Sequence, residues 1–215
     1  MIVNELVSGI IAIVAAYLVG AFPTGYVVTR MAIGQDIRQL GSGNVGANNV
    51  FGQVGPAAGI TVGIVDVSKG AAAVAIAHAI VDIPLFELNL YLVLAGLAAV
   101  VGHIWPVYLR FVGGNGLAVT IGTLIILMPQ ELGIFCALLL LLWAITRNLI
   151  LSVYISMVSV PISAWLLLED WRYTGYGIIL ILILVFAFLP TAKAALVKAG
   201  STGNLFAELL RRDKQ

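Results

Sequence analysis

The sequence predicts an all-α integral membrane protein with about seven transmembrane helices, some of them short or broken. Three observations carry this prediction: 61% of the 215 residues are hydrophobic, only 10% are charged, and the mean hydropathy is +1.10. A soluble domain is about 45–50% apolar and about 25% charged, so this chain lacks the polar residues that a water-facing surface needs. We expect a single membrane domain over residues 1–215, with residues 194–215 as a cytoplasmic tail.

Seven apolar segments are separated by short polar loops. A helix needs about 20 apolar residues to cross the roughly 30 Å hydrocarbon core of a bilayer. The segments that meet or approach this length are 6–28, 56–81, 89–109, 117–128, 133–146, 151–168 and 174–190. The fourth and fifth are short and are divided by Pro129, so they are expected as half-helices or as one re-entrant unit. Five or six spans are alternatives to seven.

The distribution of charge predicts the orientation of these spans, because basic residues favour the cytoplasmic side. With seven spans and the N-terminus outside, Arg172 is the one basic residue in an outer loop, and Lys69 lies within a span. The acidic residues of the outer loops are Glu5, Asp82, Glu87, Glu131, Glu169 and Asp170. We therefore expect the N-terminus outside and the C-terminus in the cytoplasm. A net charge of +1 with scattered cations argues against a nucleic-acid partner.

The first loop, residues 36–49, is rich in glycine and in side-chain hydrogen-bond donors. Gly41, Gly43 and Gly46 lie within six positions, which allows backbone N–H groups to converge as an anion nest. Side-chain donors in the same loop are Arg38, Ser42, Asn44, Asn48 and Asn49. A flexible surface loop is the alternative interpretation of this composition.

The second loop, residues 102–116, is expected on the same face of the membrane. Gly113, Gly114 and Gly116 open directly into the fourth apolar segment, and a helix N-terminus after a glycine-rich turn binds anions readily. His103 is expected at the headgroup level as a general base or a phosphate ligand, with a purely interfacial histidine as the alternative. Two such loops on one face indicate a ligand that contains phosphate.

Charged and metal-binding residue types inside the spans are few. Asp66 and Lys69 are three residues apart in the second span, a spacing that suits an ion pair on one helix face. Charges within a span mark a bundle interior or a polar site. Cys136 is the single cysteine, and no spacing of histidine, cysteine and carboxylates indicates a metal site, so no metal or cofactor is expected.

At these residues the sequence resembles the PlsY family of bacterial membrane acyltransferases. The matching pieces, in family order, are Gly-Ala-Phe-Pro-Thr-Gly at 20–25, the loop at 41–49, Asp-x-x-Lys-Gly at 66–70, the loop at 102–116, and Thr120. The resemblance implies a seven-helix fold of the bacterial inner membrane. It also implies transfer of an acyl chain from acyl phosphate to the 1-hydroxyl of glycerol 3-phosphate, which gives lysophosphatidic acid and phosphate without a covalent acyl-enzyme.

The loops and the resemblance together define the expected site. The catalytic residues are expected to be Arg38, Ser42 and His103. The substrate-binding residues are expected to be Gly41, Gly43, Asn44, Gly46, Asn48, Lys69, Gly113, Gly114, Asn115, Gly116 and Thr120. The expected partners are acyl phosphate, glycerol 3-phosphate and membrane lipids.

Several positions around this site depart from the family pattern. Asn115 stands where the family's Gly-Gly-Lys-Gly carries its lysine, and Pro-Thr-Ala-Lys at 190–193 replaces His-Arg-x-x-Asn. Ala21 and Ile150 stand at or near positions where serines are usual. Two alternatives follow: a non-catalytic paralogue that binds acyl phosphate or a lipid phosphate, and a small transporter of phosphorylated solutes, because broken helices with glycine-rich ends also build transport sites.

Overall fold

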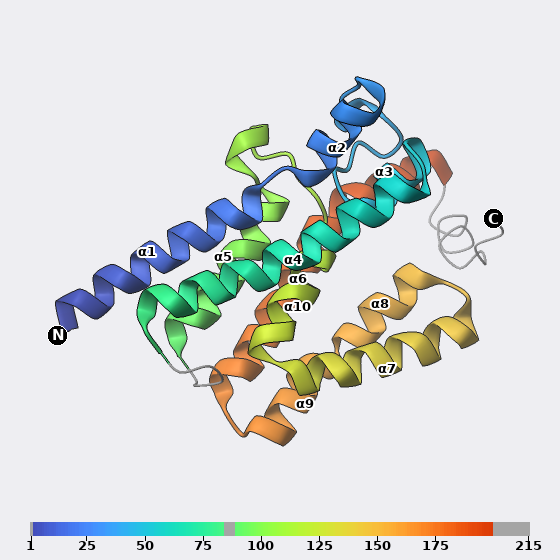
Figure 1. The fold of residues 1–215 in the computed structure, drawn as a ribbon. Helices are drawn as coiled ribbons and strands as arrows, with labels where there is room; N and C mark the ends of the chain where they lie inside the picture. Colours follow the sequence, from blue (N-terminus) through green and yellow to red (C-terminus); the bar gives the residue numbers. More distant parts are fainter. Residues whose placement is uncertain (1, 84–88, 200–215) are drawn as a thin grey trace. The chain divides into compact units, whose positions relative to one another are not determined.

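The computed structural model describes the backbone of residues 2–83 and 89–199 and the side chains of residues 5–83 and 89–190 (Figure 1). Within these ranges all regular secondary structure is helical. The elements are α1 (Ile2–Ala21), α2 (Thr24–Ile33), η1 (Ile37–Gln39), α3 (Ala47–Gln53), α4 (Pro56–Val81), α5 (Leu90–Ile104), η2 (Val107–Leu109), α6 (Leu117–Leu127), α7 (Pro129–Thr146), α8 (Leu149–Met157), α9 (Ser159–Leu168) and α10 (Trp171–Ala199), where η marks a short 3₁₀ turn. Most of the expected tail lies outside the described residues.

The predicted all-helical membrane class is confirmed. Among the described residues, six helical segments are long and apolar enough to cross a bilayer: Glu5–Ile33, Pro56–Val81, Leu90–Leu109, Pro129–Thr146, Leu149–Leu168 and Trp171–Pro190. The fourth predicted segment forms α6, which at 11 residues is about 16 Å long, half the hydrocarbon thickness. The fifth forms a full-length helix, because Pro129 occupies the first helical turn, where its missing N–H has no partner to lose. The count of seven and the orientation of the termini stay predictions.

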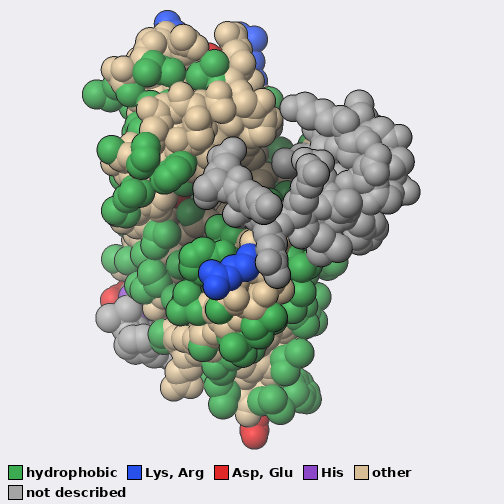
Figure 2. All heavy atoms as spheres, turned by 90° about the vertical axis from the view of Figure 1, so that its right-hand side faces the viewer, with side chains coloured by type: hydrophobic (Ala, Val, Ile, Leu, Met, Phe, Trp, Pro, Cys, Tyr) green, Lys and Arg blue, Asp and Glu red, His purple; other side chains and the backbone are tan. Residues whose placement is uncertain are grey.

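Contacts along the chain divide it into two compact units, Met1–Leu127 and Met128–Gln215. The expectation of a single membrane domain stays a prediction. On the face drawn in Figure 2, apolar side chains dominate and charged side chains are few, as a surface in contact with lipid requires.

Small residues bring the helices of unit 1, residues 1–127, into close contact. Gly20 and Gly102 lie where α1 and α5 meet, and Gly70 and Gly122 lie where α4 and α6 meet. A Cβ added at any of these four glycines would overlap a backbone atom of the facing helix. Membrane helices commonly pack through such small residues, because apolar side chains gain little by leaving lipid for protein. The contacts of Gly9 with Tyr91 and of Gly20 with Ala99 run in the same sense, so α1 and α5 are parallel and their C-terminal ends meet.

Both loops leave from these C-terminal ends. The chain breaks at Pro23 between α1 and α2, and α2 ends at Gly34, which has a positive φ of 71° and donates its N–H to the Arg30 carbonyl. Asp36 then begins η1 by accepting the N–H of Arg38. The second loop begins at the last turn of α5. The helical scaffold therefore delivers the two glycine-rich loops to one end of unit 1 (Figure 1).

Unit 2, residues 128–215, is built from α7, α8, α9 and α10. Asn148 begins α8 by accepting the N–H of Leu151 at 3.0 Å, and Gly177 of α10 packs directly on Pro161 of α9. The rings of Tyr154 and Phe188 lie 5.1 Å apart between their centroids, which joins α8 to α10. Most other apolar side chains of these helices are exposed, in keeping with contact with lipid.

The close contact between α1 and α5 generates a prediction about stability. Gly102→Ala forces a methyl group against the backbone of α1 at Tyr17, and such overpacking costs about 1–3 kcal/mol of unfolding free energy. The matched control is Gly133→Ala on α7, where a Cβ meets nothing within 4 Å. Thermal unfolding in detergent should show a lower midpoint for Gly102→Ala only. Equal midpoints for the two variants would refute the contact.

Candidate functional site

Asn49 holds the first loop in one conformation. Its side-chain oxygen accepts the Ser42 N–H at 3.0 Å, and its amide donates to the carbonyl oxygens of Leu40 at 3.0 Å and Asn44 at 2.8 Å. Asn44 closes a smaller turn inside the loop by accepting the Gly46 N–H at 2.6 Å. The loop is therefore an ordered turn, and the alternative of a flexible surface loop does not describe it.

The first loop does not present its backbone as the expected anion nest. The N–H groups of Ser42 and Gly46 are bonded to asparagine side chains, and the Gly43 N–H donates to Leu40 at 2.9 Å. The N–H of Asn44 lies 3.4 Å from the Ser42 hydroxyl oxygen. Gly43 is required for the turn itself, because its φ of 75° is left-handed. Of the side chains in this turn, Ser42 is exposed and Asn44 is half-buried.

The second loop keeps backbone donors available. Its turn is fixed by the Gly114 N–H, which donates to the His103 carbonyl at 3.1 Å, and by Gly116, which has a φ of 87°. Among the hydrogen bonds of the described residues, none uses the N–H of Asn115, Gly116 or Leu117, which form the entry to α6. Unpaired N–H groups at the start of a helix attract anions, and the helix dipole adds to this attraction.

Two hydrogen bonds join the loops. The Asn44 amide Nδ2 donates to Asn115 Oδ1 at 2.7 Å, and Arg38 Nη1 donates to the Leu109 carbonyl at 3.3 Å. In each pair the partners are 71 residues apart in sequence. The two glycine-rich loops therefore form one polar face at one end of unit 1.

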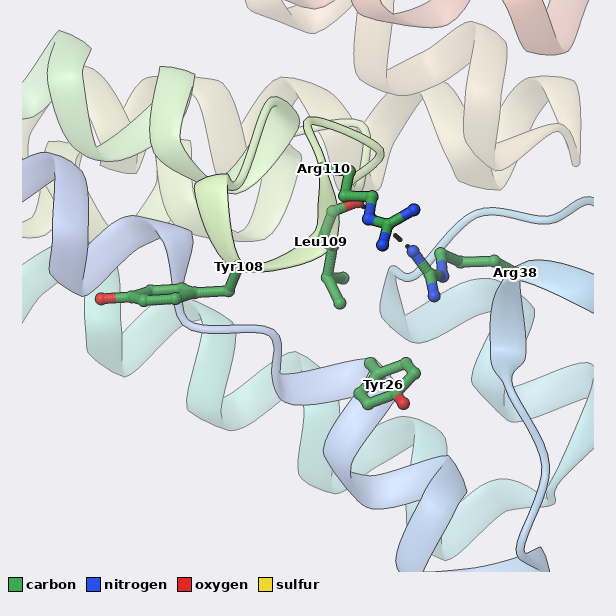
Figure 3. Close-up of a pocket in the computed structure, with 5 residues that line it drawn as sticks. All are labelled: Tyr26, Arg38, Tyr108, Leu109 and Arg110. Atoms are coloured by element: carbon green, nitrogen blue, oxygen red, sulfur yellow. Dashed lines mark hydrogen bonds between the residues drawn. The ribbon is translucent and has the colours of Figure 1, made fainter.

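A cleft of about 410 Å³ opens between α2, η1 and η2, lined by Tyr26, Arg38, Tyr108, Leu109 and Arg110. Figure 3 shows the guanidinium groups of Arg38 and Arg110 pointing toward one another, whereas the ring of Tyr108 points away from them. The Arg38 guanidinium carbon lies 5.4 Å from the centre of the Tyr26 ring, a cation–π distance. Two cations that share one cleft attract an anion into it.

The two arginines differ in how far they are already neutralised. Arg38 binds Asp36 with two of its nitrogens, one at 2.7 Å, and this hydrogen bonding holds the pKa of the Asp36 carboxyl below its usual value. Arg110 takes part in none of the ion pairs found among the described residues. The second arginine therefore brings an uncompensated positive charge to the cleft.

A buried polar cluster lies beneath the loops. Lys69 Nζ is 2.8 Å from Asp66 Oδ1 and donates to the Phe22 carbonyl at 2.8 Å, and His103 Nδ1 lies 3.8 Å from the same carboxylate oxygen. The side chains of Asp66, Lys69 and His103 are at most 7% exposed. His103 Nε2 lies so close under Gly114 that a Cβ there would overlap it.

The predicted site residues fall into two settings. On the loops, exposed or half-buried, are Arg38, Gly41, Ser42, Gly43, Asn44, Gly46, Asn48, Gly113 and Asn115. Buried below them are Lys69, His103, Gly114, Gly116 and Thr120. Pro190 lies inside α10, and the side chains of residues 191–193 lie outside the described residues. The role of each of these residues in binding or catalysis stays a prediction.

Sequence reasoning did not assign Asn49, Asp66 or Arg110 to the site. Asn49 and Asn48 are adjacent in the sequence, and only the rotation of α3 decides that Asn49 is buried and Asn48 exposed. Arg110 lies three positions before Gly113, and a cation so close to a glycine-rich turn is a sequence pattern that indicates an anion-binding residue. Asp66 was recognised as the partner of Lys69, but its proximity to His103 depends on the packing of α4 against α5.

The fold and the site define an integral membrane protein with a polar, arginine-bearing face at one end of a helical unit. The family model described as glycerol-3-phosphate acyltransferase matches residues 10–197. A curated relative, glycerol-3-phosphate acyltransferase 2 of Dehalococcoides mccartyi, is 40% identical over 98% of this chain and 97% of its own length. The glycerol-3-phosphate acyltransferase of Desulforudis audaxviator is 41% identical over 82% of this chain and 86% of its own length. The chain belongs to the glycerol-3-phosphate acyltransferase family.

A solved structure agrees with this membership. The crystal structure of PlsY (YgiH), an integral membrane glycerol 3-phosphate acyltransferase in its glycerol 3-phosphate form, superposes with a TM-score of 0.78 and 26% sequence identity. The superposition covers 89% of this chain and 93% of that chain. The resemblance to PlsY seen in the sequence is confirmed.

The role of Asn49 in the first loop can be tested against its neighbour. Asn49→Ala removes one acceptor and two donors from a buried position, and each lost hydrogen bond costs about 0.5–1.5 kcal/mol. Hydrogen exchange of residues 40–46 should therefore accelerate. Asn48→Ala is the matched control, because its exposed side chain makes none of these bonds. The same exchange in both variants would rule out this role for Asn49.

Proposed function

We propose that the chain transfers an acyl chain from acyl phosphate to the 1-hydroxyl of glycerol 3-phosphate, as the first step of phospholipid synthesis in the bacterial inner membrane. Family membership supports the reaction. The single structural observation that carries it is the joining of the two loops by Asn44 and Asn115 at 2.7 Å. Because of this bond, groups that attract anions on the two loops serve one site.

The reaction requires positioning more than a strong nucleophile. The hydroxyl oxygen attacks the acyl carbon, the bond from that carbon to the phosphate oxygen breaks, phosphate departs with the electron pair, and the proton that the hydroxyl loses passes to that phosphate. Acyl phosphate is an activated mixed anhydride, so the protein's task is to hold two phosphate-bearing molecules together and to stabilise the charge that grows on the leaving phosphate. Arg38 and Ser42 are assigned to this task from the first loop.

Two places are proposed for the two phosphates. One is the entry to α6, where the N–H groups of Asn115, Gly116 and Leu117 are available. The other is the cleft that Arg38 and Arg110 share. In this proposal Arg110 supplies the positive charge that the family's lysine contributes at the position of Asn115. An arginine suits the role, because its planar guanidinium binds two phosphate oxygens at once.

A non-catalytic, phosphate-binding role is the second candidate function. The neutral side chain of Asn115 favours it, because a charge-assisted hydrogen bond of about 1.5–3 kcal/mol is absent there. A single Dehalococcoides mccartyi strain holds relatives named glycerol-3-phosphate acyltransferase 1, 2 and 5, so members of this family coexist in one cell. No observation favours the transporter.

Turnover is the direct test of the proposed reaction. Purified protein supplied with acyl phosphate and glycerol 3-phosphate should form lysophosphatidic acid, detected by mass spectrometry, and release phosphate. Arg38→Ala and Ser42→Ala should lower kcat/KM by about 10- to 100-fold, as expected for the loss of a charge-assisted contact to phosphate.

The control for Arg38→Ala is Arg172→Ala. Arg172 makes the same kind of pair, with Asp170 two residues before it at 2.8 Å, but lies in unit 2. This control should retain full turnover. Wild-type protein that binds acyl phosphate without forming product would establish the non-catalytic alternative instead.

Asn115 can be tested by a matched pair of substitutions. Both Asn115→Lys and Asn115→Met remove the acceptor that holds Asn44, but only lysine adds a positive charge. Asn115→Lys should therefore bind glycerol 3-phosphate about 10-fold more tightly than Asn115→Met, in line with one charge-assisted contact. Titration calorimetry measures both affinities, and equal values would place this position away from phosphate.

A further inference from the structure

One carboxylate oxygen beneath the loops faces two buried partners. Asp66 Oδ1 lies 2.8 Å from Lys69 Nζ on the same helix and 3.8 Å from His103 Nδ1 on α5. We propose that Asp66 is a positioning residue, which fixes the two loops relative to one another through Lys69 and His103 without touching either substrate. This inference rests on the proposed acyl transfer and assigns to that same site a residue that supports it from below.

The first arm runs from Asp66 through Lys69 to the first loop. Lys69 Nζ donates to the Phe22 carbonyl at 2.8 Å, at the break between α1 and α2. The same carbonyl accepts the Thr24 N–H at 3.0 Å, so Lys69 adds a second hydrogen bond at the residue that follows α1 and precedes Pro23. Because α2 leads directly into the first loop, the position of Lys69 sets the direction in which the chain enters that loop.

The second arm runs from Asp66 through His103 to the second loop. The carbonyl of His103 accepts the Gly114 N–H at 3.1 Å, and the imidazole forms the floor under Gly114. A turn of this ring would displace Gly114, and with it the N–H groups at the entry to α6. Nε2 of the ring faces Gly114, and Nδ1 faces Asp66. The carboxylate therefore favours one orientation of the imidazole.

Stability alone gives little reason for three polar groups at this place. Charged groups taken out of water lose hydration energy, and buried ion pairs replaced by apolar residues often leave a protein equally stable or more stable. Polar groups within membrane-spanning helices are correspondingly rare and usually functional. This cluster connects α4 to Phe22, which precedes the first loop, and to His103, where the second loop begins. By contrast, Asn49 bonds only within the first loop, and Asn44 bonds the first loop to the second.

The experiment separates positioning from stability by removing charge singly and in pairs. Asp66→Asn leaves the Lys69 ammonium buried without a counter-charge, and the double variant Asp66→Asn/Lys69→Met removes both charges. The matched control is Asp170→Asn/Arg172→Met, which removes the 2.8 Å ion pair of unit 2. Each protein is measured in detergent for its melting temperature and for kcat and KM toward glycerol 3-phosphate.

A second readout reports the geometry of the loops directly. Spin labels are attached through Gln39→Cys in the first loop and Val112→Cys in the second, both exposed, after the single native cysteine is removed by Cys136→Ser. Pulsed electron resonance then gives the distribution of distances between the two labels. This readout requires no substrate.

We expect Asp66→Asn to lower the melting temperature and the double variant to regain it. Turnover should not recover in the double variant: kcat/KM should remain about 100-fold below the wild-type value, as expected for a site displaced by about 1 Å. The distribution of distances between the spin labels should be broad in both variants. The control should match the wild type in all measurements. If Asp66→Asn fails to fold, the double variant decides the question.

Two results would overturn the inference: full turnover in Asp66→Asn, or a double variant in which turnover and a narrow distance distribution return together with stability. Wild-type protein that makes no lysophosphatidic acid would reject the proposed reaction instead. In that case the distance distributions still decide whether Asp66 positions the loops.

Discussion

Close packing of α1, α4, α5 and α6 through glycine is the constraint on which the rest of unit 1 depends. Gly20 and Gly102 allow α1 and α5 to lie in backbone contact, and Gly70 and Gly122 do the same for α4 and α6. Larger residues would separate the helices and move their ends apart. Irregular, polar loops of a membrane protein lie at the ends of its helices, outside the hydrocarbon. The spacing of the helices therefore determines which loops come into contact.

The two loops contribute different things to the face that they form. The first loop bonds the N–H groups of Ser42, Gly43 and Gly46 internally and is held by the buried side chain of Asn49. The second leaves N–H groups at the entry to α6 available, and it brings Arg110 beside Arg38 (Figure 3). Similar glycine-rich sequences therefore form a turn held by a buried asparagine side chain in one case and a turn that brings an arginine to the cleft in the other.

Hydropathy and charge predicted the helical class and the seven apolar segments, because lipid selects strongly for apolar residues at nearly every spanning position. The glycine and asparagine motifs predicted both loops on one face, and the hydrogen bond between Asn44 and Asn115 joins them. The local sequence did not predict that an asparagine side chain bonds to the backbone of the first loop. That bonding depends on whether Asn48 or Asn49 lies on the buried face of α3. The contact of Asp66 with His103 joins residues 37 positions apart on two helices, and only their packing creates it.

The bridge between Asn44 and Asn115 is an amide–amide bond, and neither of its groups carries a charge or gains a proton in the physiological range. Counter-ions that weaken the hold of Arg38 and Arg110 on a distant anion leave such a bond nearly untouched. The distance between the loops is consequently insensitive to salt, whereas the attraction of anionic ligands to the arginines depends on it. A change in ionic strength therefore alters how often an anionic ligand associates with the cleft, while the geometry of the two loops stays the same.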